Sequence, residues 1–161
     1  MIVRPGKIWS ETAPLLDAAV AIRAGKRLIL IGDDSIQLPM VHVDDVVEGL
    51  MLAGKFSGGE IFHLVDKDTI SREELARLYT LGREPQLKTT RLSMGLACFL
   101  ARGVELLGKV LRRPMPITPY RLRSAYVALA FDCTKAREQL GWRPHISSGK
   151  SLRAMLGKSI R

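Results

Sequence analysis

Short runs of β-branched and aliphatic residues alternate with stretches of helical spacing through the first half of the chain. Extended runs are expected at 1–9, 26–31, 38–43 and 58–66, each bounded by turn residues. Helices are expected at 14–25, 45–54 and 71–82, the last with a capping box of Ser71 and Glu74. Strands that alternate with helices in this way predict an α/β fold.

The second half is more helical. Residues 93–111 form a long apolar stretch in which Arg102, Glu105 and Lys109 repeat at spacings of three and four, so we expect an amphipathic helix with one wet face and no membrane span. Further elements are expected as a helix opened by Thr118-Pro119, a short strand at 128–132, a helix at 133–141 capped by Asp132, and a last helix at 147–157. With no linker in view, residues 1–161 are expected to form a single domain.

The stretch MVHVDDVV at residues 40–47 sets two carboxylates beside a histidine. We interpret it as a junction between a strand and a helix, in which Asp44 is the N-cap and Asp45 adds favourable charge at the helix N-terminus. The flanking valines are expected to pack inward. We do not predict a metal site or an acid/base cluster here, because the sequence offers no further residues to complete one.

The charge distribution is uneven. Of the 161 residues, 47% are hydrophobic and 25% charged, which excludes a disordered or collagen-like chain. The first 80 residues hold 9 Lys/Arg against 12 Asp/Glu, whereas the remainder holds 16 against 4, a net charge of +12. A basic half suits an anionic partner such as a phosphorylated ligand, nucleic acid or acidic lipid.

Cys98 and Cys133 are the two cysteines, and no C-x-x-C motif accompanies them. We expect two buried free thiols rather than a disulfide, and a cytoplasmic location. The histidines His42, His63 and His145 are isolated in the sequence, so no metal site is predicted.

Two stretches resemble a calcium-binding loop and a phosphate-binding P-loop, but each lacks residues that its motif requires. Asp66 and Asp68 resemble the start of a calcium loop, but the required glycine and closing acid are missing, which leaves a turn with two solvated acids. SSGKSL at 147–152 lacks the first glycine of a P-loop and is interpreted as a helix start. No G-x-G-x-x-G and no Tyr-x-x-x-Lys occurs, so no catalytic residue is assigned.

Five short blocks remain, in a fixed order. They are RPGKIW, VHVDDVVEGLMLA, EIFHLVD with ISREEL, FDCTKAREQLGWRP and GKSLRAML. This order resembles the C-terminal half of extended short-chain dehydrogenases, the NAD(P)-dependent epimerase/dehydratase family. The resemblance implies that residues 1–70 supply remnant strands and helices of a Rossmann-like parallel sheet, with the RPG strand its sixth and the EIFHLVD strand its seventh. Residues 71–161 would form a mostly helical substrate-binding lobe.

The resemblance also implies site residues. Pro5 and Gly6 would lie beside the nicotinamide of the cofactor, and Arg121 or Arg123 would bind a substrate diphosphate through a planar, bidentate guanidinium. Trp9 and His42 would contact substrate. A plain turn at Pro5-Gly6 and a solvated helix face for the two arginines are the alternatives.

Other features implied by the resemblance concern activity. The family's glycine-rich loop and Tyr-Lys pair precede its sixth strand, so this chain is expected to supply only the substrate-binding part, to bind neither NAD nor NADP alone, and to have no turnover alone. No arginine occurs in IQLPM at 36–40, where nucleotide-sugar members often have one, which leaves room for a more apolar alcohol or ketone.

The expected partners follow from the same argument. One expected partner is a small-molecule substrate, with or without a phosphate group. In addition, the first strand would pair with a separate N-terminal Rossmann half or cause self-association, because its upstream edge is open. The competing class is a non-enzymatic basic module that binds nucleic acid or acidic lipid. Only 6% of residues are aromatic and the basic residues are scattered, which disfavours nucleic acid. A structural or partner-binding fragment is the third class.

Overall fold

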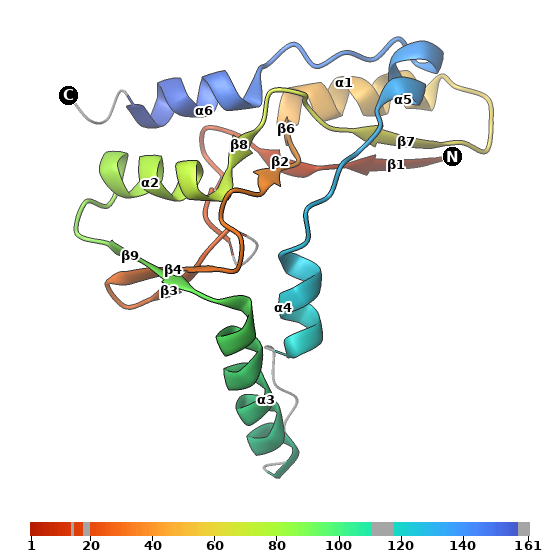
Figure 1. The fold of residues 1–161 in the computed structure, drawn as a ribbon. Coiled ribbons are helices and arrows are strands. Elements are labelled where there is room, and N and C mark those ends of the chain that lie inside the picture. The colour runs from red at the N-terminus through yellow and green to blue at the C-terminus, as the bar shows by residue number, and fades with distance from the viewer. Residues whose placement is uncertain (14, 18–19, 111–117, 158–161) are drawn as a thin grey trace. The chain divides into compact units, whose positions relative to one another are not determined.

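The computed structural model describes residues 1–13, 15–17, 20–110 and 118–157 (Figure 1). The strands are β1 (Ile2–Pro5), β2 (Lys7–Trp9), β3 (Ile22–Ala24), β4 (Arg27–Ile31), β5 (Gln37–Leu38), β6 (Met40–His42), β7 (Ile61–Leu64), β8 (Ile70–Ser71) and β9 (Lys88–Leu92). The helices are α1 (Val43–Gly54), α2 (Arg72–Gly82), α3 (Met94–Val110), α4 (Pro119–Ala125), α5 (Thr134–Gln139) and α6 (Ser148–Gly157). The α/β class is confirmed.

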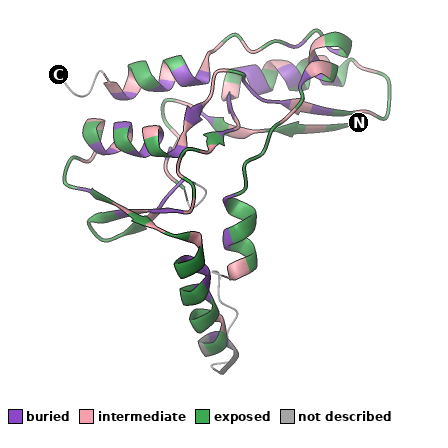
Figure 2. Cartoon of the chain, in the orientation of Figure 1, coloured by how far each residue is buried: buried purple, intermediate pink, exposed green. Residues whose placement is uncertain are grey.

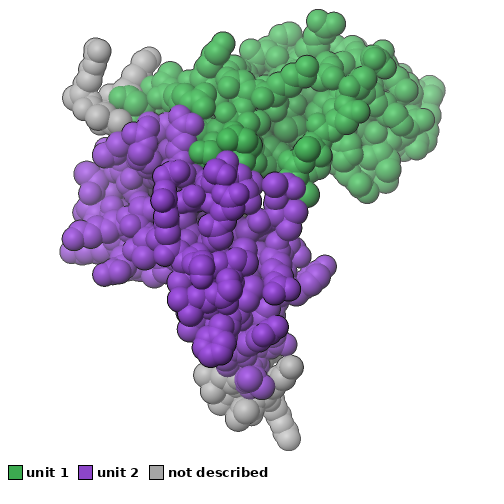
Figure 3. Space-filling view, viewed as in Figure 1, with its two compact units in different colours: residues 1–15, 37–71, 129–161 green, residues 16–36, 72–128 purple. Residues whose placement is uncertain are grey.

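The chain forms two compact units (Figure 3). Unit 1 contains residues 1–15, 37–71 and 129–161, and unit 2 contains residues 16–36 and 72–128. Each unit is assembled from separate stretches of chain, and one of the crossings between units, after residue 71, lies close to the predicted boundary at residue 70. The prediction of a single domain, divided internally at residue 70, stays a prediction.

Unit 1 is built on parallel strand pairs. β1 pairs in parallel with β7, with Ile2 opposite Ile61 and Pro5 opposite Leu64, and β2 pairs in parallel with β6. The chain therefore changes strand partner at Gly6. Two short strands, β5 and β8, add an antiparallel pair. Among the described residues, β1 pairs with β7 alone.

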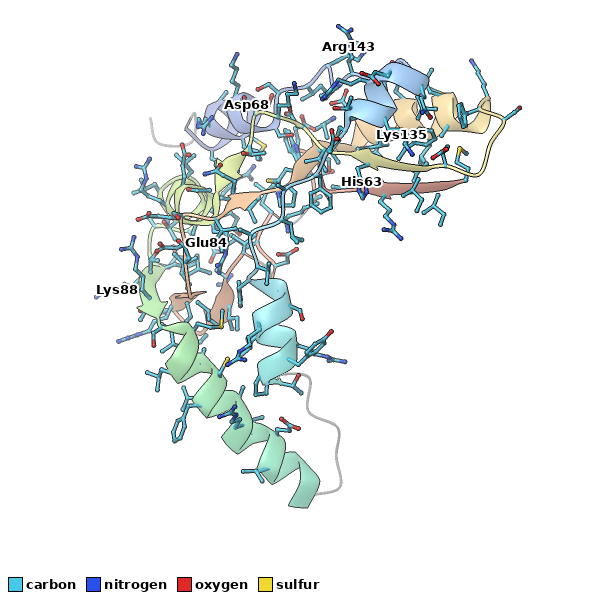
Figure 4. All side chains as sticks on the ribbon, turned by 45° about the vertical axis from the view of Figure 1, so that its right-hand side comes forward. His63, Asp68, Glu84, Lys88, Lys135 and Arg143 are labelled. Carbon is cyan, nitrogen blue, oxygen red and sulfur yellow. The ribbon has the colours of Figure 1, made fainter. Side chains whose placement is uncertain are left out.

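The core of unit 1 lies where α1 and α5 cover β7. Phe62, Leu64 and Trp142 are fully buried there, together with Val46 and Ala136. Helix α5 begins at Thr134 and its N-cap is Cys133, which makes no side-chain cap bond, so the prediction of Asp132 as the cap is wrong by one residue. Asp132 does accept the N–H of Thr134, and Gly141 beyond the helix has a φ of 70°. On the surface, Lys135 of α5 bonds Glu60 next to β7 (Figure 4).

The junction at residues 40–47 differs from its prediction. The N-cap of α1 is His42, not Asp44, because the imidazole Nδ1 accepts the N–H of Asp44 at 3.3 Å. Asp45 lies in the first turn, as expected, and Asp44 lies there too rather than at the cap. Of the flanking valines, Val41 and Val46 are buried but Val47 is exposed, so the inward packing of that residue was wrongly predicted.

Unit 2 contains a three-stranded sheet in the order β3-β4-β9. β4 pairs antiparallel with β3 and parallel with β9. The prediction of a helix over 14–25 is wrong, because residues 22–24 form strand β3. Residues 14, 18 and 19 of this stretch lie outside the described residues. Gly25, with a φ of 58°, turns the chain tightly enough for β3 to pair with β4, and this pairing overrides the helical spacing.

Helices α2, α3 and α4 of unit 2 form where they were predicted, but α3 lacks the single polar outer face that was expected, because Phe99 and Leu106 are exposed. Thr118 caps α4 by accepting the N–H of Arg121, and Pro119 stands at the first helical position. Arg102 on α3 is exposed, whereas Glu105 is half-buried. The side chain of Lys109 lies outside the described set. No helix in the described part of the chain has the length and apolarity needed to cross a membrane.

A buried arginine organises unit 2. Arg72, at the first position of α2, is 1% exposed, and its guanidinium donates to the carbonyl oxygens of Val20, Ile31 and Asp33. Its Cζ lies 4.1 Å from the centre of the Tyr126 ring. The ends of β3 and β4 are thus connected to α2 through one side chain.

Candidate functional site

A pocket lies in unit 1 at the carboxyl end of β7, and we call it the strand-end pocket. Its volume is about 440 Å³. It is lined by Gln37, Pro39, Val65, Asp66, Lys67, Thr69, the segment 129–133 and Arg137. Residues 129–132 of this segment were predicted as part of a short strand at 128–132, but the structure has no strand there. Segment 129–133 forms one wall of the pocket instead. Ligands of α/β proteins commonly bind beyond the carboxyl ends of the strands.

The charged groups of the strand-end pocket have both signs. Hydrogen bonds from Thr134 lower the pKa of Asp132, so that carboxylate is ionised at neutral pH. Arg137 lies one helical turn away and its guanidinium donates to the Thr134 hydroxyl. Lys67 adds a second cation to the lining. With Val65, Leu129 and Phe131 beside them, these groups make an apolar pocket with a polar margin, which suits binding and orientation of a small molecule.

Cys133 contributes packing rather than a reactive thiolate. Burial raises the pKa of its thiol, which keeps the group neutral at pH 7, and the Sγ donates to the carbonyl oxygen of Val65 at 3.6 Å. Cys98 is buried as well, and both cysteines are free, as the sequence predicted.

Asp66 and Asp68 bind the N-terminus of α6, so their interpretation as two solvated acids is wrong. Asp66 is buried and its Oδ2 accepts the N–H of Ser148. Asp68 (Figure 4) accepts from the Ser147 hydroxyl and the N–H of Lys150, and these bonds, the Ser147 bond first, lower its pKa. The carboxylates satisfy the orphan amides of the helix end. The reading of 147–152 as a helix start is confirmed.

Pro5 and Gly6 lie where β1 ends and β2 begins. The N–H of Gly6 donates to Leu64 at 3.0 Å, and Lys7 donates to the Pro39 carbonyl at 2.6 Å. A Cβ on residue 6 would stand 2.2 Å from the Pro39 oxygen. Close approach of two backbones therefore explains the glycine, while contact with a cofactor stays a prediction.

We expect Gly6→Ala to lower the free energy of unfolding by about 1 to 3 kcal/mol, because the clash is with backbone and neither strand can move alone. Chemical denaturation followed by the fluorescence of Trp9 and Trp142, both in unit 1, measures this. Gly59→Ala is the matched control, since a Cβ there meets nothing within 4 Å. Equal midpoints for the two variants would contradict the packing explanation.

Trp9 and His42 are brought together by the pairing of β2 with β6. Their rings are 4.7 Å apart in an edge-on arrangement, and Trp9 is 2% exposed. The indole N–H donates to the Ser148 hydroxyl, while His42 Nε2 lies 3.5 Å from Glu11. Both side chains therefore have structural partners, and their contact with substrate stays a prediction.

Arg121 and Arg123 lie on α4, in unit 2, and both are exposed. Neither lines the strand-end pocket, and nor do Pro5, Gly6, Trp9 or His42. Binding of a diphosphate by either arginine stays a prediction.

His63 and His145, the other two histidines, contact different residues. His145 pairs with Glu48 at 3.2 Å, and the His63 ring packs on Phe131 (Figure 4). Within the described residues, no group of three His, Cys, Asp or Glu side chains could hold a metal ion.

Sequence comparison finds sterol dehydrogenases. The chain is 29% identical over 158 residues to a 3β-hydroxysteroid-dehydrogenase/decarboxylase isoform of Arabidopsis thaliana, covering 88% of this chain and 36% of that protein. It is 26% identical to the decarboxylating sterol-4-alpha-carboxylate 3-dehydrogenase of Mus musculus, covering 93% and 45%. The chain thus spans less than half the length of these relatives. No family model matches the sequence.

Structure comparison finds epimerases of UDP-sugars. The fold matches the UDP-glucuronic acid 4-epimerase of Bacillus cereus in complex with UDP-glucuronic acid and NAD, with a TM-score of 0.56, 15% identity and coverage of 98% of this chain and 44% of that one. The UDP-glucose 4-epimerase of Thermotoga maritima gives a TM-score of 0.55 at 17% identity, with 96% and 44% covered. The chain therefore has a Rossmann-like fold shared with NAD-dependent epimerases, and its sequence is similar to those of 3β-hydroxysteroid and sterol dehydrogenases.

Proposed function

We propose that this chain is the substrate-binding portion of an NAD(P)-dependent oxidoreductase of the short-chain dehydrogenase type, acting on a sterol-like or other apolar alcohol or ketone. The observation that carries the proposal is the match of 88% of the chain to a 3β-hydroxysteroid-dehydrogenase/decarboxylase. The parallel pairing of β1 with β7 supports it, because this pair corresponds to the sixth and seventh strands implied by the sequence resemblance.

The strand-end pocket is the proposed substrate site. Gln37 and Pro39 line it, and both belong to the segment where nucleotide-sugar members often have an arginine. An uncharged segment at this place favours an apolar substrate over a sugar nucleotide. The tyrosine and lysine that move the proton, and the glycine-rich loop that holds NAD or NADP, belong in the proposal to a preceding Rossmann half.

The proposal is tested by joining this chain to the preceding half of the 3β-hydroxysteroid dehydrogenase of Mycolicibacterium neoaurum, a relative at 24% identity. We expect the joined protein to reduce NAD or NADP with a 3β-hydroxysterol and to leave UDP-glucose unchanged, while the 161-residue chain alone shows no turnover. Turnover by the chain alone, or oxidation of the sugar nucleotide in preference to the sterol, would refute the proposal.

Two tryptophan variants then test the pocket. Ala130→Trp places a large ring in the strand-end pocket and should lower kcat/KM for the sterol about tenfold or more, chiefly through KM. Val127→Trp, also exposed but absent from the pocket lining, is the control and should leave kcat/KM within about twofold of the parent. Equal losses in both variants would place the substrate elsewhere.

A further inference from the structure

A second pocket of unit 1 adjoins the strand-end pocket, and we call it the basic pocket. Its volume is about 330 Å³. The lining consists of three cations, Lys67, Arg137 and Arg143, the acid Asp66, and apolar residues that include Trp142 and Pro144. Lys67 and Arg137 also line the strand-end pocket, whereas Arg143 does not. Arg143 therefore distinguishes the basic pocket from the proposed substrate site.

Each cation of the basic pocket comes from a different part of unit 1. Lys67 lies shortly after β7, Arg137 lies on α5, and Arg143 lies on the segment between α5 and α6 (Figure 4). The neighbour of Arg143, Trp142, is fully buried and its indole N–H donates to the carbonyl oxygen of Asp45. This anchored residue fixes the backbone that carries Arg143, so the pocket is held together by the core of the unit.

The cations of the basic pocket are accessible to a ligand. Lys67 and Arg143 are exposed, and Arg137 is half-buried. Figure 2 shows α5 mostly in the colours of exposed and intermediate residues. The Arg137 guanidinium is also oriented, because its Nη2 donates to the Thr134 hydroxyl at 2.9 Å. A guanidinium that is held in place loses less conformational freedom when it binds an anion.

Carboxylates do not neutralise these cations. In the described part of the chain, none of the three forms a salt bridge, whereas Lys135, on the same helix as Arg137, pairs with Glu60. The one acid of the lining, Asp66, has both carboxylate oxygens bonded to backbone N–H groups, those of Asp68 and Ser148. Three cations against one acid give the lining a net charge of +2. The basic pocket thus has positive charge that the chain itself leaves uncompensated.

We propose that the basic pocket binds the phosphate group of a small phosphomonoester. A phosphomonoester carries a charge of about −1.5 to −2 at pH 7, which matches the charge of the lining. The forked guanidinium groups of Arg137 and Arg143 suit bidentate bonds to phosphate oxygens, and Lys67 adds a point charge. Trp142 and Pro144 offer apolar surface to the carbon part of the ester. This inference goes beyond the proposed function, because it requires neither a sterol nor NAD(P).

Isothermal titration of the full chain with phenyl phosphate, at constant ionic strength, tests the proposal. We expect saturable binding of one molecule per chain. Arg143→Gln should weaken this binding about tenfold or more, because a hydrogen bond between two charged groups is lost. Lys135→Gln is the matched control, since it removes one exposed positive charge from the same region but outside the pocket, and it should bind within about twofold of the parent. Equal thermal midpoints of Arg143→Gln and the parent verify that the variant folds.

The indole N–H signals in nitrogen-15 NMR spectra locate the ligand. Trp142 lines the basic pocket, whereas Trp9, also in unit 1, lines neither pocket. Phenyl phosphate should move the Trp142 signal more than the Trp9 signal, and Arg143→Gln should need about tenfold more ligand for the same change. Absence of saturable binding by the parent at about 10 mM phenyl phosphate would overturn the proposal. An equal loss in Lys135→Gln would also overturn it, by assigning the effect to overall charge, as would a larger change at Trp9.

Discussion

Replacement of Arg72 by methionine should lower the free energy of unfolding by about 3 to 5 kcal/mol, because three carbonyl oxygens lose their donors and each buried acceptor left unsatisfied costs about 1 to 3 kcal/mol. The guanidinium makes four hydrogen bonds of 2.9 to 3.3 Å, two to the carbonyl oxygen of Val20, one to Ile31 and one to Asp33, and the three bonds to Val20 and Ile31 are buried. Methionine fills similar volume but donates nothing, so the carbonyl oxygens lose their donors in a place that water does not reach. The contact with the Tyr126 ring is lost as well.

Urea denaturation followed by far-UV circular dichroism measures this effect. Arg77→Met is the matched control, because Arg77 lies on the same helix and is exposed, and a change within about 0.5 kcal/mol is expected there. Both tryptophans lie in unit 1, so their fluorescence should respond less than the dichroism if the two units unfold separately. Equal stability of the two variants would show that the carbonyl oxygens do not depend on Arg72.

Helices whose first residue is determined by neighbouring residues in the sequence could be predicted. The capping box at Ser71 and the Thr118-Pro119 pair each marked a helix start that the structure has, because a cap is an interaction over three or four residues. The region around β3 was not predictable in this way. Its apolar spacing fits a helix, but pairing with β4 across the turn at Gly25 decides its conformation, and such pairing leaves no periodic signal in the segment itself.

The candidate site was harder to predict than the fold. Asp66 looked solvated because its partner Ser148 lies 82 residues away in the sequence. The strand-end pocket combines β5, the end of β7 and segment 129–133, none of which carries a catalytic or ligand-binding motif of its own. The resemblance located Pro5-Gly6 at the end of a sheet strand, which the structure has, yet the reason for the glycine, its approach to Pro39, could be seen only in three dimensions.

The second large effect concerns the carboxylates of the strand-helix junction, where sequence reasoning treated Asp44 and Asp45 as helix-end charges. Asp45 is 2% exposed, and its Oδ1 and Oδ2 accept the N–H groups of His145 and Ile146 at 2.8 and 3.2 Å. Its carbonyl oxygen also accepts the indole N–H of Trp142 at 2.8 Å. One residue of α1 thereby binds the segment that leads into α6.

We expect Asp45→Ala to lower the free energy of unfolding by about 3 to 5 kcal/mol, because two charge-assisted hydrogen bonds are lost and two part-buried amides lose their acceptors. Asp44→Ala is the control. Asp44 has the same charge in the same helical turn, but its side chain is exposed and only its Oδ2 approaches His42 Nδ1, at 3.5 Å, so its loss should cost about 0.3 to 1 kcal/mol, the scale of a helix-dipole contribution. Denaturation followed by tryptophan fluorescence compares the two, since Trp142 is bonded to the Asp45 backbone. A difference of less than about 1 kcal/mol between these variants would mean that Asp45 acts through the dipole and not through His145 and Ile146.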